Sequence, residues 1–242
     1  MKYMGSKARH AKELLPIILK DHTPDMWYVE PFVGGANMIS KVPNYFKRLG
    51  SDTHEYLIAL LSAASQGWLP PKSITEDQYM EIKNNKENYP PELVGYTGFA
   101  LSYGAMWFSS YRKDSVGKRN YSAESYRSAI KEFPLLRGVN FLNKSFNDLI
   151  LPRSCTIYCD PPYRNTAQYK NSKTNKNITF DHERFYDWCV ERHREGHKVF
   201  ISEYWMPEDR FECVWQKEVN NSLTKDTGSK KGIEKLFIVK GV

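Results

Sequence analysis

Four consecutive residues, Asp160, Pro161, Pro162 and Tyr163, form the part of the chain best suited to chemistry. They follow the apolar run 155–159, which has the composition and length of a buried strand. Open α/β sheets place their chemistry beyond the carboxyl ends of such strands. The two prolines fix φ and remove two N–H donors, so the turn is rigid and its carbonyl oxygens stay available. The carboxylate and a carbonyl can accept hydrogen bonds from an amino group, while the ring stacks on a planar base. An ordinary Asp-Pro surface turn is the alternative.

A glycine-containing segment, 30–37, reads Glu-Pro-Phe-Val-Gly-Gly-Ala-Asn and follows a predicted strand over 26–29. We expect a helix after it, through about Tyr45. A strand, a glycine turn and a helix are typical of a nucleotide-like cofactor site, because glycine lets the backbone approach the ligand and the helix start adds its dipole. The spacing is not G-x-G-x-x-G, which disfavours a dinucleotide. A simple Gly-Gly turn is the structural alternative.

Two charged residues extend this candidate site. Asp52 follows a predicted strand over 46–51, where an acidic side chain in such folds binds ribose hydroxyls. The same residue can cap the next helix, expected over 55–64. Lys7 follows Ser6, the candidate cap of a first helix, where a helix dipole does not favour a cation. Lys7 is therefore either placed to meet a ligand carboxylate or simply solvated.

The remaining pattern predicts one α/β domain with an insertion. Further strands are expected over 139–141 and 197–202, a helix over 181–195, and a terminal hairpin with strands 211–219 and 236–239. Periodicity is weaker between 66 and 139, and prolines punctuate that stretch. We therefore predict a catalytic domain of residues 1–65 and 140–242, interrupted by a mainly helical insert of residues 66–139.

Basic residues interleave with aromatic residues in the insert, and the chain carries a net charge of +7. Positive charge for phosphates and rings for bases are typical of a nucleic-acid surface. A helical subdomain that packs its own aromatics and solvates its cations is the alternative. A polar loop over 164–178 could close over a strand of DNA. The candidate DNA contacts are Arg112, Lys113, Lys118, Arg119, Arg127, Lys170 and Lys173.

Several classes of protein are disfavoured by composition. The four cysteines form no C-x-x-C pair and the six histidines no H-E-x-x-H pattern, so no metal site is expected. Cys155 and Cys159 share a strand face and are expected to be buried and reduced. The basic start lacks a signal-peptide apolar region, and no stretch is apolar enough to cross a bilayer. We expect a cytoplasmic protein that does not contact membranes.

Combined in chain order, the motifs resemble the Dam-like DNA adenine-N6 methyltransferases. The matching segments are KYMGSK at 2–7, YVEPFVGGAN at 28–37, SDT at 51–53, NKSFNDLI at 143–150, IYCDPPY at 157–163 and ISEYWMP at 201–207. The resemblance is weak between about 66 and 140. It implies a Rossmann-like, seven-stranded, mostly parallel sheet with one antiparallel strand. It also implies S-adenosylmethionine as methyl donor and an adenine flipped out of double-stranded DNA as substrate.

The resemblance also implies roles for individual residues. Asp160 and Pro161 would bind the target amino group, with Pro162 in the same motif, and Tyr163 would stack on the flipped base. Asp52 would bind the ribose, and Phe146 would lie against the adenine of the cofactor. The remaining cofactor contacts would be Tyr3, Lys7, Glu30, Phe32, Gly34, Gly35 and Ala36, with Asp160 bordering them. Ala36 departs from the family, in which many relatives carry glycine, and we expect it to keep a normal φ and to tune the pocket.

Three other interpretations stay open. A methyltransferase acting on RNA or on protein glutamine would share the cofactor sheet, although the glutamine enzymes usually carry Asn at the position of Asp160. A DNA-binding protein with decayed catalysis would keep the basic surface alone. A nicotinamide dehydrogenase would need the missing glycine fingerprint. The sequence does not determine the target site, and a monomer is favoured.

Overall fold

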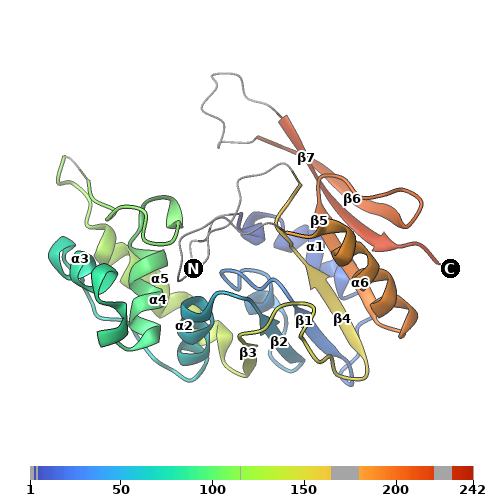
Figure 1. Cartoon of the computed structure of the whole chain (residues 1–242), viewed down its shortest axis with the longest axis horizontal. Helices are drawn as coiled ribbons and strands as arrows, with labels where there is room; N and C mark the ends of the chain where they lie inside the picture. Colours follow the sequence, from blue (N-terminus) through green and yellow to red (C-terminus); the bar gives the residue numbers. More distant parts are fainter. Residues whose placement is uncertain (1–2, 4, 115, 165–179, 221–230, 242) are drawn as a thin grey trace.

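The computed structural model describes residues 3, 5–114, 116–164, 180–220 and 231–241. Within these residues one seven-stranded sheet has the strand order β3-β2-β1-β4-β5-β7-β6 (Figure 1). The strands are β1 (Trp27–Glu30), β2 (Lys47–Ser51), β3 (Val139–Leu142), β4 (Cys155–Cys159), β5 (Lys198–Glu203), β6 (Phe211–Asn220) and β7 (Lys231–Val239). Each strand expected from the sequence is present, with boundaries that differ by a few residues.

Strand direction agrees with the predicted fold class. Strands β3, β2, β1, β4 and β5 pair in parallel, and β7 pairs antiparallel with both β5 and β6. Strand β7 therefore runs opposite to the other six strands of the sheet. The order reverses between β1 and β4, and such switch points open a crevice at the carboxyl ends of the strands. The residues that end β1, β4 and β5 meet at this edge.

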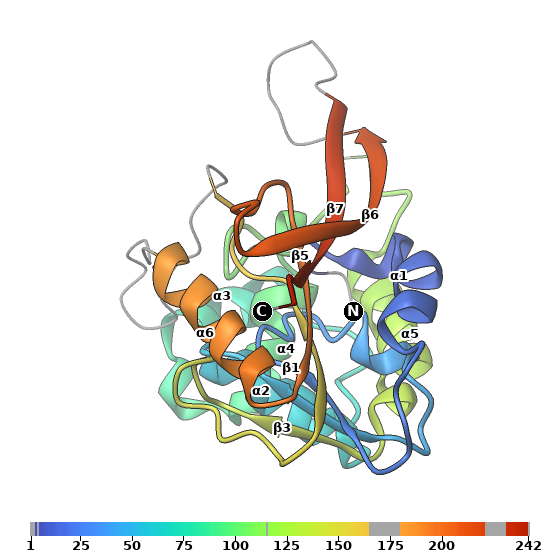
Figure 2. The same ribbon diagram turned by 90° about the vertical axis from the view of Figure 1, so that its right-hand side faces the viewer.

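Alternate residues of the central strands pack into two cores, one on each face of the sheet. Tyr28 and Tyr158 face the larger core, together with α1 (Ala11–Ile18) and α2 (Glu55–Ser65). Val29 and Ile157 face the other core, against α6 (His182–Arg194). Figures 1 and 2 show α6 and α1 on opposite sides of the sheet. All five residues of β4 are buried, as expected for a central strand covered on both faces.

The insert is helical and packs on α2. Its helices are α3 (Glu76–Asn84), α4 (Pro91–Ala100) and α5 (Tyr121–Glu132). A side chain at Gly95 would place its Cβ 2.1 Å from the backbone oxygen of Tyr56, so α4 can lie this close to α2 only with glycine there. Tyr79, Tyr96 and Phe99 of the insert belong to the same core as α1 and α2.

The helix expected after the glycine segment, through about Tyr45, is wrong. Only a 3-10 turn, Ile39–Lys41, forms there. Pro43 has no N–H to donate to the carbonyl of Ile39, and a proline favours extended geometry in the preceding residue. Val42 accordingly has φ −68° and ψ 133°.

The buried Arg48 replaces those missing helical hydrogen bonds. Its guanidinium donates to the carbonyls of Ile39 and Val42 at 3.4 and 3.3 Å. It also donates to the carbonyls of Leu135 and Arg137, at 3.2 and 2.5 Å. One side chain thus ties the segment after the glycine turn to the end of the insert.

The first helix also differs from expectation. Ser6 caps a 3-10 turn, Lys7–Arg9, and accepts a hydrogen bond from the backbone N–H of Ala8. The α-helix begins only at Ala11 and contains Pro16 near its end. Cys155 and Cys159 are buried and free, as predicted. No helix in the described part of the chain is long and apolar enough to cross a membrane.

Candidate active site

Lys7 lies against the turn 160–163, which the sequence predicts to be catalytic and which we call the catalytic turn. Its Nζ is 3.1 Å from Oδ1 of Asp160 and 3.0 Å from Oε1 of Glu234. The same nitrogen lies 4.5 Å from the centre of the Tyr163 ring. Burial alone would lower the pKa of Lys7, but the charges and hydrogen bonds of Asp160 and Glu234 raise it above its ordinary value. Lys7 is therefore a permanent cation between two carboxylates.

Asp160 keeps 22% of its side chain exposed, directly after β4. Burial of the rest raises the pKa of Asp160; Lys7 offsets part of that rise and Glu234 adds to it. Lys7 contacts one carboxylate oxygen, Oδ1, and a hydrogen bond with Tyr163 also lowers the pKa of Asp160. A carboxylate has two oxygens, each with two lone pairs, so Asp160 retains acceptor capacity for a substrate.

Tyr163 is held at both its hydroxyl group and its ring. Its hydroxyl donates to Oε1 of Glu234 over 2.5 Å, and the ring of Tyr204 meets it edge-on at 4.7 Å. Burial, with the charges of Asp160 and Glu234, raises the pKa of Tyr163 well above 10, so the hydroxyl stays protonated. The orientation of the ring is thus fixed by contacts within the protein.

Two further carboxyl groups border the turn. Glu30 ends β1 and accepts from the hydroxyl of Tyr28 at 2.9 Å. Glu203 ends β5 and accepts from the backbone N–H of Tyr204 at 2.9 Å. Burial raises the pKa of Glu203 to about 8 and raises the pKa of Glu30 well above its ordinary value, and the charge of Asp160 contributes to both shifts. Glu30 and Glu203 therefore resist ionising beside a charged Asp160.

The glycine turn is shaped around Tyr3. A Cβ added at Gly34 would lie 2.9 Å from Cε1 of Tyr3, and one added at Gly35 would lie 2.5 Å from the Cβ of Tyr3. Gly34 has φ +47°, a conformation that suits glycine. Ala36 has φ 56°, so the expectation of a normal φ there is wrong. A left-handed residue at this position explains why glycine would be the less strained choice.

Asp52 connects the glycine turn to the start of α2. Its Oδ2 accepts from the N–H of Gly34 at 3.1 Å, and its Oδ1 accepts from the N–H of His54 at 3.0 Å. The helix cap is His54, whose Nδ1 accepts from the N–H of Leu57 at 3.3 Å, so the prediction of Asp52 as cap is wrong. Burial lowers the pKa of His54 to about 4, which keeps this nitrogen available as an acceptor.

A cluster of aromatic rings includes Phe32 and Phe146, the two phenylalanines predicted to contact the cofactor. Phe32 and Phe146 lie 5.4 Å apart between ring centres. Phe180 and Phe185 pack on both rings within 6 Å, and Trp188 meets Phe146 edge-on at 5.6 Å. The structure thus brings together two residues predicted to contact the cofactor from segments more than 100 positions apart.

A family model for D12 class N6 adenine-specific DNA methyltransferases matches residues 3–234. The chain belongs to this family. The match spans the glycine turn, the insert and the catalytic turn, and it ends at Glu234. No curated protein matches the chain significantly. Membership makes the chain a DNA-methylating enzyme whose target is the N6 atom of adenine.

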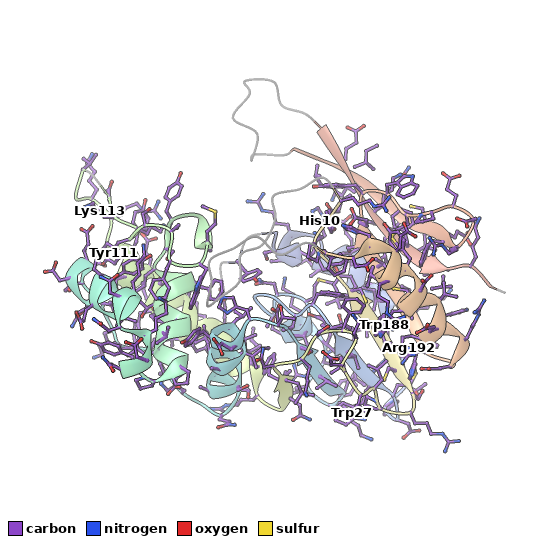
Figure 3. The ribbon with its side chains drawn as sticks, viewed as in Figure 1. His10, Trp27, Tyr111, Lys113, Trp188 and Arg192 are labelled. Atoms are coloured by element: carbon purple, nitrogen blue, oxygen red, sulfur yellow. The ribbon has the colours of Figure 1, made fainter. Side chains whose placement is uncertain are left out.

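Five of the seven basic side chains predicted to contact DNA lie in the insert of this methyltransferase. Lys113 pairs with Glu76 at 2.9 Å, and Arg119 pairs with Glu124 at 2.8 Å. The guanidinium of Arg112 lies 3.9 Å from the centre of the Tyr121 ring. Figure 3 shows Lys113 at the end of the insert, far from Trp188 on α6. Lys118 and Arg127 are exposed, whereas Lys170 and Lys173 lie outside the described residues.

Sequence reasoning missed two carboxyl groups of the cluster around Asp160. Glu203 stands within the segment 201–207 and ends a strand, and that position was an available signal. Glu234 belongs to no motif and follows a basic stretch, so the sequence offered no comparable signal. Among the described residues, no group of three or more His, Cys, Asp or Glu side chains could hold a metal ion.

Proposed function

We propose that this DNA adenine-N6 methyltransferase uses S-adenosylmethionine and acts on an adenine flipped out of duplex DNA at a specific sequence. The observation that carries the proposal is the catalytic turn. A partly exposed carboxylate lies at the carboxyl end of a central strand, beside a ring that is already fixed in position. An acceptor for an amino group and a surface for stacking a base are what this reaction needs.

The residues along the strand edge fit the proposed cofactor. Each carboxylate oxygen of Asp52 accepts a hydrogen bond from one backbone N–H, and its remaining lone pair can accept from a ribose hydroxyl. Gly34 and Phe32 line the adjacent turn, and Phe146 supplies a ring for an adenine. Burial, with a smaller contribution from neighbouring carboxylates, raises the pKa values of Glu30 and Asp160, and a cationic ligand would favour their ionised forms. When bound, S-adenosylmethionine supplies a methyl group whose bond to the positive sulfur breaks with both electrons remaining on sulfur.

Asp160 and Pro161 would activate the adenine. The target cannot reach the reaction centre inside a duplex, so it leaves the base stack and lies against Tyr163. Asp160 and the carbonyl of Pro161 accept the two N–H bonds of the amino group, which frees its lone pair from the ring and directs it at the methyl group. Positive charge then develops on N6 next to the Asp160 carboxylate, and this fixed charge stabilises it. Asp160 or water takes the proton that N6 loses after transfer.

The insert, residues 66–139, would recognise the target sequence. Its exposed cations pair with acidic neighbours that phosphates can replace. Lys170 and Lys173 would add contacts from the segment after the catalytic turn. We expect a monomer that works in the cytoplasm, where the free thiols of Cys155 and Cys159 remain reduced.

A substrate comparison tests the proposal. The purified chain is incubated with S-adenosylmethionine labelled in its methyl group and with duplex DNA, RNA or a glutamine-containing peptide. Labelled N6-methyladenine released by digestion of the duplex is the expected product. Label in RNA or peptide alone would contradict the proposal, and salt-dependent DNA binding without transfer would favour a decayed enzyme. Mapping of methylated bases in DNA from expressing cells would then identify the target sequence.

A further inference from the structure

Glu234 reaches the catalytic turn because β7 runs against the other strands. The carboxyl ends of β4 and β5 carry Asp160 and Glu203, and the antiparallel β7 begins at that same edge. Glu234 is the fourth residue of β7 and pairs in register with Lys217 of β6. Figure 2 shows the β6–β7 hairpin extending beyond the other strands. A strand two places away from β4 thereby delivers a carboxylate to the turn that follows β4.

One oxygen of Glu234 serves two partners. Oε1 accepts from the hydroxyl of Tyr163 at 2.5 Å and lies 3.0 Å from Nζ of Lys7. The side chain of Glu234 is 7% exposed, so water screens these contacts only weakly. Lys7 meanwhile contacts Asp160 at nearly the same distance, 3.1 Å. Lys7 is thus divided between the proposed catalytic carboxylate and Glu234.

We propose that Glu234 is a positioning residue for methyl transfer, which fixes the ring of Tyr163 and shares Lys7 with Asp160. This inference rests on the proposed function of Asp160 and Tyr163. Through the first contact, the stacking surface is oriented before a base arrives, so less ordering remains for the bound state. Through the second, Lys7 neutralises Asp160 only in part, and Asp160 remains a strong acceptor for the amino group.

The contact that Lys7 shares between Glu234 and Asp160 should affect the pH dependence of the reaction. Asp160 faces Lys7, Glu30 of β1, Glu203 of β5 and Glu234 of β7, together with the hydroxyl groups of Tyr158 and Tyr163. The negative charge of Glu234 raises the pKa of Asp160. Loss of that charge leaves Lys7 entirely to Asp160 and lowers the pKa of Asp160. The acid limb of kcat, which requires ionised Asp160, should then move to lower pH.

The test compares Glu234→Gln with Glu212→Gln, a neutralised glutamate at an exposed position of β6. Glutamine keeps an acceptor for the Tyr163 hydroxyl but removes the charge. We expect kcat of Glu234→Gln to fall about tenfold, equivalent to about 1.4 kcal/mol, with its acid limb at lower pH. The KM values for DNA and cofactor should stay within about threefold, because ground-state binding is not the interaction removed. Glu212→Gln should match the wild type.

Tyr163→Phe tests the hydroxyl of Tyr163, which hydrogen-bonds to Glu234 and also to Asp160. It removes the hydroxyl and keeps the ring, so kcat should fall severalfold with little change in stability. In the double variant with Glu234→Gln, the two losses should be less than additive, because Glu234→Gln weakens, by removing the charge of the acceptor, the hydrogen bond that Tyr163→Phe removes.

Three results would overturn the inference while wild-type transfer is intact. They are an unchanged kcat in Glu234→Gln, an unmoved acid limb, or an unchanged kcat in Tyr163→Phe. A wild-type chain that transfers no methyl group to DNA adenine would contradict the proposed function instead, so the two failures are distinguishable.

Discussion

Lys7, which contacts the catalytic turn, and Lys113 in the insert both pair with carboxylates near 3 Å, but the first pair is buried and the second exposed. The side chain of Lys7 is 9% exposed and contacts both Asp160 and Glu234. The side chain of Lys113 is 66% exposed and pairs with Glu76, which is itself 47% exposed. Water and salt screen the second pair and hardly reach the first.

The difference separates a fixed site from an adaptable surface. Removing one partner of a buried ion pair leaves an uncompensated charge, which is costly. An exposed pair contributes little to stability and exchanges its partner easily, for example for a phosphate. Under the proposed function, the turn 160–163 is ordered before a substrate arrives, whereas the exposed cations of the insert can exchange their carboxylate partners for phosphates.

The largest expected effect is on turnover in Asp160→Ala. Loss of the acceptor should lower kcat at least about 1000-fold, because no other group at the turn can stabilise charge on N6 in the same place. The folded state and DNA binding should persist, because burial disfavours the charged form of Asp160 and its removal relieves that cost. Single-turnover assays with labelled cofactor measure the first effect, and fluorescence anisotropy with duplex DNA measures the second. Near-normal turnover would contradict the mechanism.

The comparison between the two lysines is tested directly by Lys7→Met and Lys113→Met. Lys7→Met leaves Asp160 and Glu234 buried without their cation and should lower the free energy of unfolding by about 3 kcal/mol at neutral pH. Lys113→Met should cause no measurable change. Urea denaturation measures both. Equal losses in the two variants would mean that burial does not distinguish these pairs.

The Lys7→Met deficit should depend on pH with a defined sign. The folded-state pKa of Asp160 is already raised, so its ionisation opposes folding as pH rises, and loss of Lys7 raises that pKa further. The deficit should therefore grow as pH rises and shrink as Asp160 becomes protonated, toward a minimum below about pH 4. A deficit that is constant from acid to neutral pH would contradict this electrostatic account.

A smaller effect is expected on DNA binding by the insert. Lys113→Gln and Lys118→Gln should each weaken binding to all duplexes by about two- to threefold and reduce the salt slope by about one. Lys20→Gln is the matched control. Lys20 is exposed and follows α1 at the amino-terminal edge of the sheet, near Asp21, whose carbonyl accepts from Lys198 at the start of β5. Figure 3 shows that edge at Trp27. Equal weakening by Lys20→Gln would argue against the insert as the DNA surface.

The smallest effect is expected for Ala36→Gly. Glycine relieves the left-handed strain of Ala36, but it loses a buried methyl group and gains freedom in the unfolded chain. These contributions oppose one another, so the free energy of unfolding should change by less than about 1 kcal/mol. Denaturation curves with and without S-adenosylmethionine measure the change. A large loss of cofactor affinity would show that the methyl group itself contacts the ligand.

Local patterns in the sequence were sufficient to predict the strands of the sheet and the turn that follows β4. The apolar run before Asp160 and the acidic residue Asp52 after the second strand are both patterns of a few adjacent residues. The structure places Asp160 and Asp52 at the same edge of the sheet. The helix predicted after the glycine turn does not form, for one local and one tertiary reason. Pro43 was visible, but Arg48 satisfies the carbonyls that a helix would have used, and that contact depends on the folded chain.

The sequence by itself determined which residues end the strands, because strand period and proline geometry act over a few positions. Only the tertiary structure decided what surrounds them. Lys7, Asp160 and Glu234 come from opposite ends and the middle of the chain, and they meet because β7 returns antiparallel to the edge where β4 ends. Their charges interact strongly only at close range and away from water. Both conditions arise only when the sheet has formed and these side chains are buried at one edge of it.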